Sequence, residues 1–147
     1  MKRGRRPEAL FVGYGNPLRG DDAVGRYVAG KLGGMVIHQL VPELAERLAA
    51  QELVVFIDAR RDLEPGAVEI MPIDETAVMT HSCSAGYLLK LTRQVYGRAP
   101  RGLMVGIGAE SFEFGAPLSE PVRRAAQRAL WQLRCLQHAP QVTGRAT

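Results

Sequence analysis

The chain has 147 residues and a mass of 16.1 kDa, the size of one ordinary domain. Its 46% hydrophobic and 23% charged residues exclude disorder as the general state. The net charge of +4 comes from one end, because Lys2, Arg3, Arg5 and Arg6 are basic and the other 15 basic residues balance the 15 acidic ones. We therefore expect a charged tail and no nucleic-acid-binding face.

The apolar runs are too short for a membrane span, which needs about 18 residues. The first apolar stretch is about six residues long, unlike that of a signal peptide, and it runs into Asn16 and Asp21. Cys83 and Cys135 form no CxxC pair and are too few for a disulfide framework. These features predict a cytoplasmic protein with no membrane partner, and we expect it to be a monomer.

Five runs rich in Val, Ile and Phe predict strands, and apolar residues at helical spacing predict four helices between or after them. In chain order, the strands are expected at about residues 9–14, 35–38, 53–58, 67–72 and 102–109. The helices are expected around residues 24–32, 44–48, 88–95 and 122–133.

This alternation predicts an α/β fold, a three-layer sandwich in which helices cover both faces of a five-stranded, mostly parallel twisted sheet. A short turn after the third strand makes the fourth strand the expected antiparallel member. We expect one domain over residues 1–147, with residues 1–7 and 139–147 loosely ordered. Ligands of such sheets bind beyond the carboxyl ends of the strands, so the loops after strands one, three and five carry the candidate site.

Polar residues follow each of these strands. The glycine-rich segment GYGNPLRGDDAVG, residues 13–25, follows the first strand, Asp58 ends the third, and Glu110 follows the fifth. His81, on the loop before the third helix, reaches the same edge if that loop folds over the sheet. Carboxylates and an imidazole suit a divalent metal, and the same groups suit acid–base catalysis.

Structural roles compete with these functional ones. Either Asp21 or Asp22 is suited to capping the first helix, and Asp58 to bonding loop amides. A loop histidine such as His81 is more often solvated than a ligand. Cys83 and His38 are given no role beyond packing or solvation, and the role of Glu110 stays open.

The glycine-rich segment begins like a dinucleotide-binding fingerprint but does not complete it. Leu18 stands where the third glycine belongs, and His38 and Gln39 stand where an acid is expected. The HExxH, GxSxG and GxxxxGK[ST] motifs are also missing from the sequence. Nucleotide binding is therefore a weak hypothesis.

Four segments in the same order resemble the [NiFe]-hydrogenase maturation endopeptidases: GYGNPLRGDDAVG, FIDA, THS and VGIGAESFEFG. The resemblance spans roughly residues 9–136. It implies an α/β sandwich and an endopeptidase that removes the carboxyl-terminal extension of a hydrogenase large-subunit precursor after nickel insertion. The precursor is then the partner, and the segment at residues 38–44, which only a subset of the family shares, leaves the hydrogenase type open.

By position, the resemblance implies that Asp22, Asp58 and His81 contact the nickel of the precursor and serve in catalysis. It implies no tightly bound cofactor of the enzyme's own. Gly15, Asn16 and Asp21 are then assigned to supporting the loop, with Asp21 capping the first helix and Asn16 bonding backbone groups. The alternative function is a non-catalytic metal- or nucleotide-binding assembly factor with the same fold.

Overall fold

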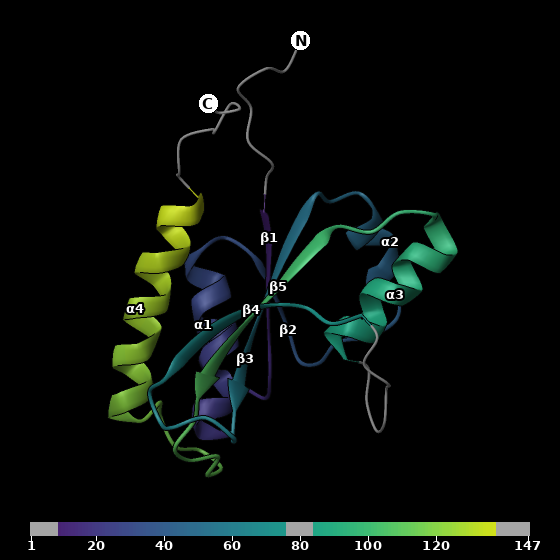
Figure 1. Ribbon diagram of the computed structural model, residues 1–147. Coiled ribbons are helices and arrows are strands. Elements are labelled where there is room, and N and C mark those ends of the chain that lie inside the picture. Colours follow the sequence, from purple (N-terminus) through teal and green to yellow (C-terminus); the bar gives the residue numbers. More distant parts are fainter. Residues whose placement is uncertain (1–8, 76–83, 138–147) are drawn as a thin grey trace.

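The computed structural model describes residues 9–75 and 84–137 (Figure 1). The described residues form one sheet in the order β2-β1-β3-β5-β4. β1, β2, β3 and β5 are parallel, and β4 is antiparallel to β5. The strands are β1 (Ala9–Tyr14), β2 (Met35–Ile37), β3 (Leu53–Arg60), β4 (Val68–Pro72) and β5 (Arg101–Gly108). The predicted α/β class is confirmed, as are the five strands and the antiparallel fourth.

Helices lie on both faces of the sheet. α1 and α4 cover one face, and α2 and α3 cover the other (Figure 1). A short 3-10 helix, η1, leads directly into α1. The bounds are η1 (Gly20–Ala23), α1 (Val24–Lys31), α2 (Leu44–Ala49), α3 (Ala85–Tyr96) and α4 (Glu120–Gln137). Within the described ranges, no helix is both long enough and apolar enough to span a membrane.

The central strand β3 is buried on both faces, which explains its unbroken apolar run. Val55 and Ile57 pack in the core under α1 and α4, whereas Val54 and Phe56 pack under α2 and α3. All four are fully buried. Because side chains alternate along a strand, Asp58 follows Phe56 on the α2–α3 face.

Close packing of α1 brings η1 to the end of the sheet. A Cβ at Gly25 of α1 would overlap the carbonyl oxygen of Ile57 in β3. The helix can approach the strand this closely only because residue 25 has no side chain. The segment between β1 and α1 is thereby held beside the carboxyl end of β3.

Candidate functional site

The chain turns sharply after β1, and the turn depends on Gly15. Its φ of +138° belongs to the region that favours glycine, and a Cβ there would overlap the carbonyl oxygen of Asp22. The Gly15 amide donates to the carbonyl oxygen of His38 at 3.0 Å, joining the ends of β1 and β2. Gly15 therefore permits the backbone path that places Asp22 against the turn.

Asp22 is half-buried on η1 and is fixed by this turn. Its Oδ2 accepts a hydrogen bond from the Asn16 amide at 2.7 Å. The Asn16 side chain in turn accepts from the amide of Leu18 at 2.9 Å, so Asn16 bonds backbone groups of its own loop. One carboxylate oxygen of Asp22 is thus used to hold position, and Oδ1 has no hydrogen bond to another described residue.

Asp58 continues β3 into the same edge of the sheet. Burial, and after it the negative charge of Asp22, raises the pKa of Asp58 to about 6. Hydrogen bonds from the Ala59 backbone and the Tyr14 side chain, with the charge of Arg60, act in the opposite direction. Asp22 and Asp58 are therefore close enough to repel each other, and a proton or a cation placed between them would relieve that repulsion.

Asp21 has a different role from the one predicted, and the capping prediction was wrong for both acids of the pair. Ala23 stands at the N-cap of α1, and no side chain caps that helix. Asp21 is instead fully buried, at 0% exposure. Its carboxylate accepts four hydrogen bonds from the loop that follows β5, from Glu110 N (2.8 Å), Ser111 N (3.0 Å), Ser119 N (2.7 Å) and Ser119 Oγ (2.8 Å).

These hydrogen bonds decide the charge of Asp21. Burial acts to raise its pKa, but the amides of Ser119, Ser111 and Glu110 and the Ser119 hydroxyl outweigh burial, so the pKa is lowered. Asp21 is therefore an ionised buried carboxylate that ties the loop after β5 to the loop after β1. Asp21 therefore supports the loop at residues 110–119 and does not cap the first helix.

The other candidates fall outside this carboxylate pair. The side chain of Glu110 is exposed, β5 ends at Gly108, and only the Glu110 backbone bonds Asp21. His38 is exposed. His81 and Cys83 lie outside the described residues. Within residues 9–75 and 84–137, no group of three His, Cys, Asp or Glu side chains is placed to hold a metal ion.

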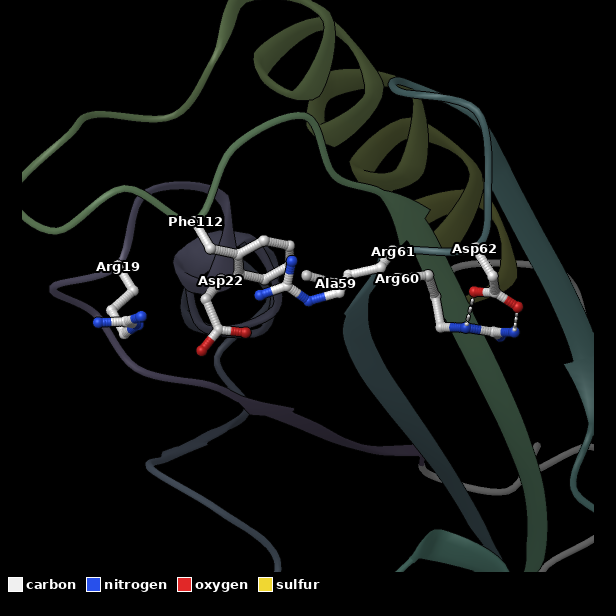
Figure 2. A pocket seen from close by; sticks show the side chains of 7 residues that line it. All are labelled: Arg19, Asp22, Ala59, Arg60, Arg61, Asp62 and Phe112. Carbon is white, nitrogen blue, oxygen red and sulfur yellow. Dashed lines mark hydrogen bonds and ion pairs between the residues drawn. The ribbon is translucent and has the colours of Figure 1, made fainter.

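A pocket of about 550 Å³ lies beside Asp22 (Figure 2). Figure 2 shows the Arg61 guanidinium over the ring of Phe112, next to the Asp22 carboxylate. The lining residues are Arg19, Asp22, Ala59, Arg60, Arg61, Asp62 and Phe112. Sequence reasoning did not single out either residue of this stack. Phe112 lies within the VGIGAESFEFG segment but was given no role there, and its contact with Arg61 joins loops 51 positions apart.

This geometry suits two kinds of chemistry. Two carboxylates at one edge provide hard oxygen ligands for a divalent cation. A carboxyl group with a pKa near 6 is also matched to taking up a proton near neutral pH. The open pocket next to Asp22 gives an extended molecule, such as a polypeptide segment, access to the edge.

The family model described as hydrogenase maturation protease (HycI) matches residues 32–134 of this chain. No curated protein matches the chain.

Solved structures of similar proteins share the fold. The [NiFe] hydrogenase maturation protease HycI from Thermococcus kodakarensis KOD1 superposes with a TM-score of 0.73 at 23% identity, over 89% of this chain and 92% of that one. HybD from Thermococcus kodakarensis gives 0.68 at 25% identity, over 88% and 99%. The hydrogenase maturating endopeptidase HybD from E. coli gives 0.72 at 23% identity, over 90% and 94%.

Proposed function

Because the chain belongs to the hydrogenase maturation proteases, a family of peptide hydrolases, we propose that it removes the carboxyl-terminal extension of a nickel-loaded [NiFe]-hydrogenase large-subunit precursor. One structural observation carries the assignment of the site. Asp22 comes from η1 and Asp58 from β3, and the charge of one raises the pKa of the other. Such a pair is stable at neutral pH only at a cost in free energy, which is typical of a functional site.

We assign Asp22, Asp58 and His81 to contacting the nickel that the precursor carries. The mutual repulsion of Asp22 and Asp58 supports this assignment, because a cation would remove it. Two oxygen ligands and one imidazole form a donor set that divalent first-row metals accept. In this proposal nickel is part of the substrate, and the enzyme has no resident cofactor.

In the chemical step, the oxygen of a water molecule bonds to the peptide carbonyl carbon, and the C–N bond breaks. A protein group takes a proton from the water and returns it to the leaving nitrogen. Asp58 is our candidate for that group, through the carboxylate oxygen that does not contact nickel, because burial and the Asp22 charge make it more basic than an ordinary aspartate. Nickel recognition places the precursor on this edge of the sheet, and the adjoining pocket receives the chain around the scissile bond. Recognition and hydrolysis then depend on the same two carboxylates.

The proposal is tested by incubating the purified protein with nickel-loaded and nickel-free precursor and following the intact mass of the precursor. Loss of the extension only from the nickel-loaded form supports it. Equal cleavage of both forms would remove nickel from the recognition step. Binding of the nickel-loaded precursor without any cleavage would favour the alternative, a non-catalytic assembly factor.

A further inference from the structure

Three arginines line the pocket beside Asp22, and they differ in how their charge is used. Arg60 forms a bidentate pair with Asp62, with Nε–Oδ1 at 2.8 Å and Nη2–Oδ2 at 2.6 Å, and lies 3.7 Å from Glu69. Arg19 and Arg61 are exposed and form no ion pair with any residue in the described ranges. The pocket therefore offers two guanidinium groups that form no ion pair with a described carboxylate, although Asp22 lies close by.

The Arg61 guanidinium is held in place by an aromatic ring. Its Cζ lies 3.9 Å from the centroid of the Phe112 ring (Figure 2). Phe112 follows Glu110 and Ser111, whose amides both bond the buried Asp21 carboxylate. Stacking uses the face of a guanidinium and leaves its N–H groups free at the edge. Asp21 thus fixes the loop that holds the Arg61 guanidinium ready for a ligand.

The backbone of Arg19 is tied to the same loop. Arg19 and Phe114 form an isolated antiparallel β-bridge, and the Arg19 amide donates to the carbonyl oxygen of Asn16 at 3.2 Å. In Figure 2, Arg19 and Arg61 lie on opposite sides of Asp22. Both arginines are therefore positioned by backbone that also positions the candidate catalytic edge.

We propose that Arg19 and Arg61 form a subsite that binds the carboxylate of an acidic side chain in the precursor, close to the cleaved bond. This inference rests on the proposed function. The planar donor fork of arginine matches a carboxylate in two parallel hydrogen bonds. Without such a subsite, Asp22 and Asp58 would repel an acidic residue in the substrate, so the two arginines turn an unfavourable residue into a recognised one.

The size of the pocket limits where the acidic residue lies. A volume of about 550 Å³ is that of a sphere about 10 Å across. An extended chain advances about 3.4 Å per residue, so this distance holds two or three residues. The recognised Asp or Glu therefore lies within about three residues of the cleaved bond.

The test combines enzyme and substrate variants. Arg61→Gln is assayed against the nickel-loaded precursor, and each Asp or Glu near the cleaved bond is changed to its amide. We expect each change alone to raise KM about tenfold with kcat nearly unchanged, because the contact is made in both ground and transition states. When the enzyme and substrate changes are combined, KM should rise hardly further than with either change alone, since both remove the same contact. Arg61→Lys should raise KM less than Arg61→Gln does, because lysine keeps the positive charge but not the planar donor fork.

Arg101→Gln is the matched control, because Arg101 is exposed at the start of β5, at the opposite edge of the sheet. Equal kinetics for the Arg61→Gln and Arg101→Gln enzymes would overturn the subsite. A precursor with no acidic residue within about three residues of the cleaved bond would also overturn it. So would a rise in KM caused by amidating the precursor's terminal carboxyl group, because the ligand would then be that group and not an acidic side chain.

A binding measurement separates failure of the subsite from failure of the proposed function. N-acetyl-glutamate amide is titrated into the ¹⁵N-labelled protein, with N-acetyl-glutamine amide as the control ligand. We expect saturable shifts of the Arg19 and Arg61 Nε–H signals with the glutamate ligand only. If no precursor is cleaved but these shifts occur, the proposed function fails and the subsite stands; identical responses to both ligands would overturn the subsite.

Discussion

Asp22 on η1 and Asp58 near the carboxyl end of β3 interact at the edge of the sheet: after burial, the Asp22 charge is the main cause that raises the pKa of Asp58 to about 6. The Asp22 carboxylate is held by the Asn16 amide at 2.7 Å, while Asp58 ends a strand segment buried on both faces. Each carboxylate is held by its own hydrogen bonds, Asp22 by Asn16 and Asp58 by the Ala59 backbone and the Tyr14 side chain. The pair is therefore an electrostatic feature of the folded protein, present before any substrate binds.

Asp22→Asn should lower the pKa of Asp58 from about 6 toward its ordinary value, because it removes a neighbouring negative charge and leaves burial unchanged. The carboxyl carbon of Asp58, followed by NMR during a pH titration, measures this directly. Glu52→Gln is the control, since Glu52 is exposed just before β3, at the opposite end of the strand. An unchanged Asp58 pKa in the Asp22→Asn protein would show that the two carboxylates do not interact.

Asp58→Asn should stabilise the fold at pH 8 and have little effect at pH 3.5. The folded-state pKa is raised from 3.8 to about 6, so the folded protein binds more protons than the unfolded chain between these values. The free energy of unfolding therefore falls as pH rises through this window, by up to about 3 kcal/mol. Urea denaturation of both proteins at the two pH values tests this, and equal destabilisation at both would contradict it.

Asp21→Ala should destabilise the protein by about 3 kcal/mol or more, because it leaves four donors of the 110–119 loop without their acceptor. Asp62→Ala, at an exposed and solvent-screened ion pair, should destabilise the protein far less than Asp21→Ala does. Urea denaturation measures both, and limited proteolysis should cut the 110–119 loop faster in the Asp21→Ala protein. Similar stabilities for the two variants would contradict the anchoring role of Asp21.

The role of Asp21 shows where reading the sequence fails. A short acid just before a helix is a normal capping residue, and that local pattern predicted the cap. The actual partners, Ser111 and Ser119, lie 90 and 98 positions away, and no local pattern indicates them. The stacking of Arg61 on Phe112 was missed for the same reason, since it depends on how two loops meet in the folded chain.

The fold itself was predictable because each element has its own periodic signal. The apolar run of β3 and the helices alternating with strands predicted the mostly parallel α/β sheet. The short turn after β3 predicted that β4 is antiparallel. Strand ends at a common edge also placed Asp22 and Asp58 together. The pKa of Asp58 was not predictable, because it depends on burial and on the distance to Asp22 in the folded protein.

His81→Ala should weaken binding of the nickel-loaded precursor about tenfold, since it removes the imidazole assigned to nickel, and should leave binding of the nickel-free form unchanged. Surface-immobilised precursor in both forms allows the two affinities to be compared. His38→Ala is the control, because His38 is exposed and its hydrogen bond to Gly15 uses only the backbone. Equal affinities for wild type and His81→Ala would remove His81 from nickel recognition.

The most direct test of the central claim is the rate at which wild-type and Asp58→Asn proteins shorten the nickel-loaded precursor, followed by intact mass at pH 7. Asparagine keeps the shape of the side chain but can neither take up a proton nor carry a charge to nickel. We expect the wild-type protein to remove the extension and Asp58→Asn to do so at least about a hundredfold more slowly. Processing by Asp58→Asn at the wild-type rate would contradict the assignment of this carboxylate pair as the active site.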